Sequence, residues 1–284
     1  MRDSTPGTGG EALPAILGDI TIEYEITGEG PDLVWLHGLS GSLEESRPLV
    51  TRLSQRFRVL SYSTRGHGRS TPILEPSRYR YDLIARDLAA MLDHTGFDRP
   101  LLAGGSHGAN TILRHEAMFP GRARGLLLVA PGANALRRPK RPHWWLIRGH
   151  LAWAYHRRGN DGIIAAICGY DPALTHDDPA VRATIAAAQS HDMASLRAAM
   201  RFVPDQAAVD PTALPHFDLP VIVAAWDRDP LIHPIAVART IASLIPGADF
   251  EQMARPHGLS PTASADTAAQ LIGDWAARLH ARLV

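Results

Sequence analysis

"LLAGGSHGANTILRHEA", residues 101–117, places a serine between glycines where one kind of pattern gives way to another. The aliphatic run at its start predicts a buried strand, and residues 110–119 predict a helix. In a sharp strand-to-helix turn the central residue is held in a strained backbone conformation, and side chains two positions away collide with neighbouring elements. Gly104 and Gly108 remove those side chains, so the pattern indicates that Ser106 is exposed at the tip of such a turn.

This turn favours a nucleophilic role for Ser106. A serine hydroxyl is a poor nucleophile at neutral pH, so a catalytic serine needs an adjacent base, a group that orients the base, and donors for the oxyanion. The predicted turn supplies one donor, because the amide of His107 lies at the positive end of the following helix, where negative charge is stabilised. Ser106 is therefore the candidate nucleophile.

Most of the chain alternates short apolar runs with helical patterns. The predicted strands are 59–62, 101–103, 125–130, 221–226 and 249–253, and the predicted helices are 81–94, 110–119, 235–245 and 263–282. This alternation implies an α/β fold with a mainly parallel sheet covered on both faces. Before it, residues 20–26 alternate apolar and polar side chains, and a turn at 28–31 leads to a second strand at 33–36. This first part predicts an antiparallel start.

The alternation stops in the middle of the chain. Residues 136–212 show helical periodicity, several prolines and no strand pattern, which predicts a helical cap inserted into one α/β domain. Residues 15–135 and 213–284 then form the core. Residues 1–14 are rich in Gly, Ser, Thr and Pro and lack the apolar core of a signal peptide, so we expect a disordered lead-in.

Two further segments make the chain resemble the α/β-hydrolase fold family. The segment LHGLSG, residues 36–41, is similar to the oxyanion segment of that family. The resemblance implies an oxyanion hole formed by the backbone amides of Leu39 and His107. The segment TRGHGRS, residues 64–70, is similar to the R-G-x-G-x-S turn of the family, although Ser63 stands where the family usually has aspartate.

The resemblance also implies the partners of Ser106. An acid is expected just after the strand at 221–226, where Asp229 fits the family's D-P-x-x-P ending better than Asp227 does. A base is expected in the loop between the last strand and the last helix, where His257 stands. Nucleophile, acid and base then follow one another in the family's order. The expected catalytic triad is therefore Ser106, Asp229 and His257.

The activity that the resemblance implies is that of a serine hydrolase. We expect cleavage of a carboxylic ester, lactone or thioester through an acyl-enzyme, with no cofactor. The segment PHGL, residues 256–259, is also similar to the esterase and cofactor-free haloperoxidase branch of the family. Two alternatives use the same residues or the same fold: an acyltransferase or cyclase, and a small-molecule receptor with slow or no turnover.

The predicted cap carries the features that bear on substrate. Trp144, Trp145 and Trp153 are candidates for lining a substrate pocket that takes a hydrophobic acyl or aromatic group, although they would equally pack the cap onto the core. Residues 136–160 contain many basic side chains and no acidic one before Asp161. This basic cluster favours either an anionic substrate or acidic carrier protein, or simply a solvated helix face.

Composition excludes several other classes of partner and site. Lys and Arg equal Asp and Glu at 29 each, so overall charge gives no reason to expect nucleic acid or a membrane surface as a partner. The single cysteine, Cys168, excludes an intrachain disulfide and fits a reducing, cytoplasmic location. The remaining histidines lack the spacing of a metal site, so no metal is expected.

Overall fold

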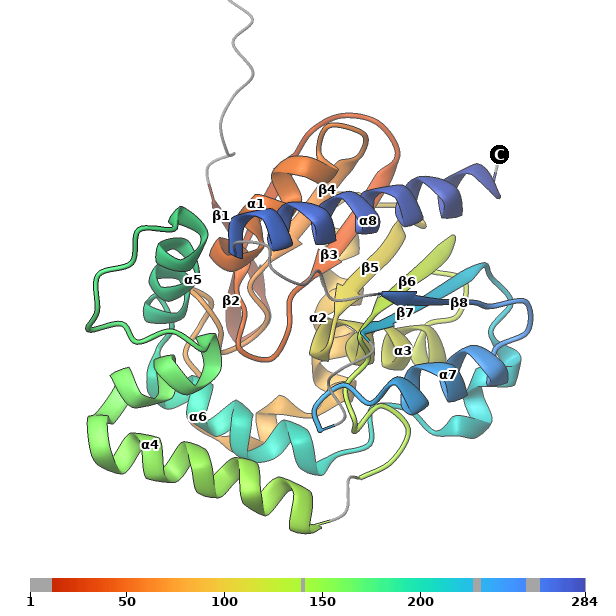
Figure 1. The fold of residues 1–284 in the computed structure, drawn as a ribbon. Coiled ribbons are helices and arrows are strands. Elements are labelled where there is room, and N and C mark those ends of the chain that lie inside the picture. The colour runs from red at the N-terminus through yellow and green to blue at the C-terminus, as the bar shows by residue number, and fades with distance from the viewer. Residues whose placement is uncertain (1–11, 139–140, 227–230, 254–260, 284) are drawn as a thin grey trace, which may run out of the picture.

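A computed structural model describes residues 12–138, 141–226, 231–253 and 261–283 of the chain. Its centre is an eight-stranded sheet with the strand order β1-β2-β4-β3-β5-β6-β7-β8 (Figure 1). The strands are β1 (Leu13–Leu17), β2 (Ile20–Thr27), β3 (Asp32–Leu36), β4 (Arg58–Tyr62), β5 (Leu101–Gly105), β6 (Gly125–Val129), β7 (Val221–Trp226) and β8 (Asp249–Met253). All neighbours from β4 onward in this order are parallel, as the βα alternation predicted.

The antiparallel part of the sheet is larger than predicted and paired differently. β2 is antiparallel to both β1 and β4, whereas β3 is parallel to β4 and β5. The predicted direct pairing of residues 20–26 with 33–36 is therefore wrong, because β4 lies between the two strands. Leu13 and Pro14, which were expected in the lead-in, are the first residues of β1. The rest of that predicted lead-in, residues 1–11, lies outside the described residues.

Helices cover both faces of the sheet. They are α1 (Leu43–Leu53), α2 (Tyr81–Thr95), α3 (His107–Met118), α7 (Ile235–Leu244) and α8 (Pro261–Ala281), with 3-10 turns at Pro76–Tyr79, Val203–Asp205 and Pro211–His216. Successive residues of a strand point to opposite faces. Leu33 and Trp35 of β3 therefore pack with α1 and α8, while Val34 and Leu36 pack with α2, α3 and α7. Figure 1 shows these two layers on either side of the sheet.

Three helices lie between β6 and β7 in the chain, and we call them the cap helices. They are α4 (Arg141–Cys168), α5 (Pro179–Gln189) and α6 (Met193–Phe202). Gly159 kinks α4, and a small cluster that includes Ile164, Val181 and Ile185 joins α4 to α5. In Figure 1 the cap helices stand beside the sheet rather than over either of its faces. No helix in the described part of the chain is long and apolar enough to cross a membrane.

Candidate active site

The turn between β5 and α3 holds Ser106 in a strained conformation. Its backbone has φ 53° and ψ −110°, a region that a non-glycine residue occupies only at a cost of about 1–3 kcal/mol. The Ser106 N–H donates to the Val129 carbonyl at 2.9 Å, and the Ser106 carbonyl accepts from Asn110 N–H at 3.0 Å. These bonds to β6 and to the first turn of α3 fix the strained backbone.

Both glycines of the turn are required by close packing. A Cβ on Gly108 would lie 2.3 Å from the Leu36 carbonyl oxygen, and a Cβ on Gly104 would lie 2.8 Å from the Gly108 carbonyl carbon. Real Cβ atoms do not approach other atoms this closely. The glycines therefore allow α3 to start directly against the end of β3, which brings Ser106 to the loop that follows β3.

That loop, residues 37–41, lies against Ser106 and is held by histidine. A Cβ on Gly38 would be only 3.7 Å from the Ser106 Cβ. The His37 Nε2 accepts from Thr64 N–H at 3.0 Å, so its Nδ1 carries the proton and donates to the Gly38 carbonyl at 2.6 Å. Burial also lowers the pKa of His37 well below its usual value, so this imidazole is neutral and holds the loop rather than serving as a base.

Two more histidines fix the carbonyls of the same loop. His67 Nε2 lies 2.8 Å from the Leu39 carbonyl. His191 Nδ1 accepts from Gly68 N–H at 3.0 Å, so its Nε2 donates to the Ser40 carbonyl at 3.1 Å. Burial lowers the pKa of His67 and lowers the pKa of His191 to about 4, which keeps both rings neutral. Because the carbonyls of Leu39 and Ser40 are bound to these rings, the loop is held in one orientation beside Ser106.

The two predicted oxyanion donors both lie beside Ser106. His107 is the first residue of α3, and Leu39 lies in the loop that contacts Ser106. Neither backbone N–H donates a hydrogen bond to any other described residue. Two N–H groups beside a serine hydroxyl are what an oxyanion needs.

The His107 side chain belongs to the protein interior. Its Nδ1 lies 3.2 Å from the Tyr81 hydroxyl, which also accepts from the side-chain amides of Asn110 and Asn134 at 3.2 Å each. With its oxygen occupied by two amides, the Tyr81 hydroxyl donates its proton to His107. Burial lowers the pKa of His107 to about 3, in agreement with a neutral ring that accepts this bond. Despite this grouping of histidines, the described residues contain no set of three His, Cys, Asp or Glu that could hold a metal.

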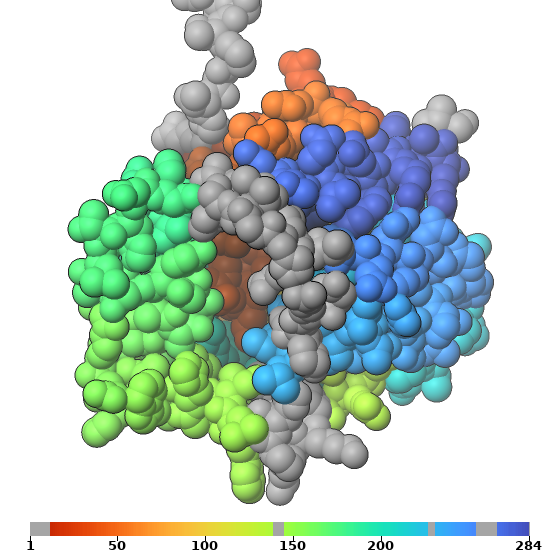
Figure 2. Space-filling view, viewed as in Figure 1, coloured from red at the N-terminus to blue at the C-terminus, as the bar shows by residue number. Residues whose placement is uncertain are grey.

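A cavity of about 550 Å³ opens above Ser106. One wall is the loop 38–40, and the opposite wall comes from the cap helices. The cap residues that line it are Leu146, Ile147, Arg148, His150, Leu151, Ala166, Ile167 and Met200. The wall is therefore mostly apolar with few polar groups, as small-molecule sites usually are. Figure 2 shows a hollow beside the cap helices, in green, with N-terminal residues in orange-brown at its base.

An imidazole contacts the nucleophile, but it belongs to a histidine other than the expected base, His257. His233 Nε2 lies 2.8 Å from Ser106 Oγ, and both residues line the cavity. The available signal was its place four residues after the candidate acid, in the segment that leaves the end of β7. Asp227, Asp229 and His257 lie outside the described residues.

Comparison with known proteins identifies the fold. Residues 31–161, which run from β3 into the cap, match the family model for the alpha/beta hydrolase fold. A hydrolase from Pseudomonas aeruginosa superposes with a TM-score of 0.73 at 22% identity, covering 93% of this chain and 98% of that one. The chain has the α/β-hydrolase fold.

Relatives of this α/β hydrolase have hydrolytic activities in their names. RutD of Caulobacter segnis, named for carbamate hydrolysis, is 28% identical over 84% of this chain and 90% of its own. The 3-oxoadipate enol-lactonase 2 of Acinetobacter baylyi is 26% identical over 75% of this chain and 78% of its own. An enol-lactonase structure from Burkholderia xenovorans has a TM-score of 0.70 at 24% identity, covering 92% and 98% of the two chains. These similarities support an enzyme of the hydrolase class.

The tryptophans predicted to line the substrate pocket of this α/β hydrolase do not do so where they are described. Trp145 and Trp153 have 66% and 55% of their surface exposed, and neither lines the cavity. Trp153 instead stacks on His150 and lies under the Arg157 guanidinium. Leu146, Ile147 and Leu151 of α4 line the cavity instead. The side chain of Trp144 lies outside the described residues.

The family's missing aspartate has a local substitute. Ser63 Oγ lies 2.6 Å from the Glu23 carboxylate, and that carboxylate also accepts from the Arg69 N–H at 2.8 Å. Glu23 is on β2, so a neighbouring strand provides the negative charge that residue 63 lacks. Ser63 Oγ in turn accepts from Leu43 N–H at 2.9 Å, which ties this turn to the start of α1 behind the loop 37–41.

Proposed function

We propose that this α/β hydrolase is a serine hydrolase that cleaves a carboxylic ester, lactone or thioester through an acyl-enzyme. Ser106 attacks the carbonyl carbon, and the amides of Leu39 and His107 receive the oxyanion. Each such donor is worth about 3–4 kcal/mol in a transition state. A histidine takes the serine proton and returns it to the leaving group, after which water attacks the acyl-enzyme.

The observation that carries the proposal is the convergence on Ser106. A strained serine lies in a cavity next to two amides without partners among the described residues, and an imidazole lies 2.8 Å from its hydroxyl. Strain of this kind persists only where surrounding structure holds it, and it clusters at functional sites. The lactonase and carbamate-hydrolase names of the relatives agree with attack on a carbonyl carbon.

Two histidines compete for the role of base. The family's chain order favours His257, with Asp229 as the group that orients it, and this is the triad that we propose. The contact with Ser106 favours His233 instead. Since the hydroxyl has one proton to give, only one of the two imidazoles accepts it.

Single substitutions decide between these assignments. The measurements are stoichiometric labelling by a fluorophosphonate probe and steady-state hydrolysis of aryl esters with short to long acyl chains. Ser106→Ala should abolish labelling, and loss of the base should lower kcat by about 10²–10⁴-fold. His257→Ala should show this loss while His233→Ala shows a smaller one; the reverse order would assign the base to His233. A folded native chain that neither labels nor turns over would refute the serine hydrolase.

Acyl transfer and slow receptor function remain the competing proposals for the same cavity. An acyltransferase or cyclase would use the same serine, amides and base, and would differ only in passing the acyl group to an alcohol or amine. Adding such acceptors during ester turnover and measuring the ratio of transfer product to acid distinguishes it from a hydrolase. A receptor would label once and retain its product, so a burst without multiple turnovers would favour it.

A further inference from the structure

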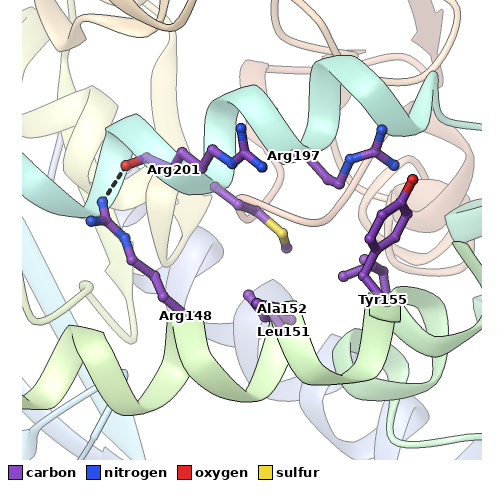
Figure 3. A pocket seen from close by; sticks show the side chains of 8 residues that line it. Arg148, Leu151, Ala152, Tyr155, Arg197 and Arg201 are labelled. Atoms are coloured by element: carbon purple, nitrogen blue, oxygen red, sulfur yellow. Dashed lines mark hydrogen bonds between the residues drawn. The ribbon is translucent and has the colours of Figure 1, made fainter. Parts of the chain in front are cut away.

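A second pocket lies between two cap helices, next to the catalytic cavity. Its volume is about 250 Å³. Leu151, Ala152 and Tyr155 line it from α4, and Arg197 and Arg201 line it from α6 (Figure 3). These spacings of three and four residues place the side chains on one face of each helix. The pocket is therefore a seam between facing helix surfaces.

Three arginines line this seam, and none of the described residues that line it is acidic. Arg148 reaches from α4 to α6, where it donates to the Arg201 carbonyl (Figure 3). It also pairs with Asp205, in the 3-10 turn that follows α6, at 2.6 Å. Arg197 donates to Asn160 at 2.9 Å and lies 4.6 Å over the Tyr155 ring. Neither Arg197 nor Arg201 forms an ion pair with a carboxylate in the described part of the chain. Two guanidinium groups in the seam are thus without a direct ion pair among the described residues, although the charge of Asp192 lies within electrostatic reach of Arg197.

The seam adjoins the cavity that Ser106 lines. Arg148, Leu151 and Met200 line both the seam and the 550 Å³ cavity, so one wall serves both spaces. Two other arginines of α4 make their contacts outside the seam. Arg158 forms a bidentate pair with Asp171, and Arg157 lies on the Trp153 ring. The seam thus places two guanidinium groups, those of Arg197 and Arg201, next to the cavity wall.

We propose that this seam is an anion subsite, and that the substrate carries a carboxylate remote from its scissile carbonyl, held by Arg197 and Arg201. Guanidinium groups pair with carboxylates through charge-assisted, often bidentate, hydrogen bonds. The apolar side chains of the cavity wall pack against the chain that joins the carboxylate to the carbonyl. This inference rests on the proposed hydrolase activity and names the substrate class for it.

Matched ester pairs test the subsite. The substrates are aryl half-esters of dicarboxylic acids of increasing length, each compared with the aryl ester of the methyl-terminated acid of equal length. A second series, acetyl esters of ω-hydroxy acids, carries the charge on the alcohol side. The native enzyme should prefer the charged member at one chain length in one of the two series. Arg201→Gln and Arg197→Gln should each lower the charged-to-neutral ratio of kcat/KM by about tenfold or more.

Arg157→Gln is the matched control, because it removes the same charge from α4 outside the seam. Arg157→Gln should leave the charged-to-neutral ratio of kcat/KM within about twofold of the native value. Added salt should lower that ratio for the native enzyme. If all three substitutions lowered this ratio equally, the preference would come from general surface charge, and the subsite would be refuted. Ser106-dependent turnover of neutral esters with no preference for charge in either series would also refute it.

Binding separates failure of the subsite from failure of the hydrolase. Titration calorimetry with dicarboxylates from glutarate to suberate, and with monocarboxylates of equal length, needs no turnover. Tighter binding of one dicarboxylate that Arg201→Gln weakens and Arg157→Gln does not would support the subsite even for a chain that hydrolyses no ester. The absence of such a difference would overturn it, whatever the esters show.

Discussion

Replacing Gly108 by alanine should disrupt the contact between α3 and β3 that brings Ser106 to its loop. The new Cβ would lie 2.3 Å from the Leu36 carbonyl oxygen and 2.7 Å from the Leu36 carbonyl carbon, about 1 Å closer than carbon atoms normally approach. Both contacts are with backbone of a central strand, which cannot rotate away as a side chain would. Overpacking costs about 1–3 kcal/mol. Because rigid backbone must move here, we expect a loss of stability of at least about 3 kcal/mol.

Two further glycines provide variants whose expected stability can be ranked against that of Gly108→Ala. A Cβ on Gly104 meets the Gly108 carbonyl carbon at 2.8 Å, whereas a Cβ on Gly149 in α4 meets nothing within 4 Å. Gly104→Ala should therefore cost less than Gly108→Ala, and Gly149→Ala should raise the free energy of unfolding by up to about 1 kcal/mol from helix propensity alone.

Urea unfolding followed by circular dichroism measures the order of the three variants, and aryl-ester turnover measures the site. A shift of about 1 Å between Ser106 and the loop 37–41 should cost about 10²-fold in kcat for Gly108→Ala. A Gly108→Ala chain within about 1 kcal/mol of native stability would refute the packing argument. Native kcat in that variant would refute the coupling between α3 and the loop.

Three other perturbations follow from buried polar groups. Lowering the pH from 7 to 5.5 should lower the free energy of unfolding by about 1 kcal/mol for each of His107, His115 and His191. Burial holds the pKa of each ring at about 3 to about 4 in the folded chain, whereas the same imidazoles take up protons near pH 6.5 in the unfolded chain. A urea midpoint that stays constant between these two pH values would contradict this. His191→Ala removes two hydrogen bonds to buried backbone and should cost about 1–3 kcal/mol, with kcat falling more than KM rises in steady-state assays. Asp87→Ala leaves the Arg65 guanidinium buried without its partner and should cost about 3–5 kcal/mol in thermal unfolding, most of which the double variant Arg65→Met/Asp87→Leu should recover.

The strand-turn-helix around Ser106 was predictable because its information is local. The aliphatic run, the glycines and the start of the helix all lie within a few residues of one another. The alternation of strand and helix patterns likewise predicts the parallel strands. Strand pairing was not local. β4 lies between β2 and β3 in the sheet although 30 residues separate it from β2 in the chain, and this pairing cannot be read from the turn at 28–31. Helix α1 escaped prediction because Pro48 interrupts its pattern, although Ser42 caps its start by accepting from Glu45 N–H.

The cap was harder to predict than the core because its orientation depends on contacts far along the chain. Tryptophan signals a buried surface in general, but whether Trp153 or Leu151 faces the cavity is set by the rotation of α4 against α6 and the core. The same limit applies to His233, whose contact with Ser106 joins residues 127 positions apart. Residue type indicated the chemistry, and only the folded chain brings these groups together.

The hydrogen bond from His191 to the loop 37–41 has a consequence for exchanging parts between relatives. Cap helices that carry pocket side chains invite transplantation as a block to change substrate preference. His191 sits between α5 and α6, yet it supports the Ser40 carbonyl of the core. A transplanted cap without a donor at this position would bring new pocket walls while leaving the recipient's loop unsupported. A chimera should therefore keep a histidine at position 191, so that the transplanted cap still donates a hydrogen bond to the Ser40 carbonyl of the recipient core.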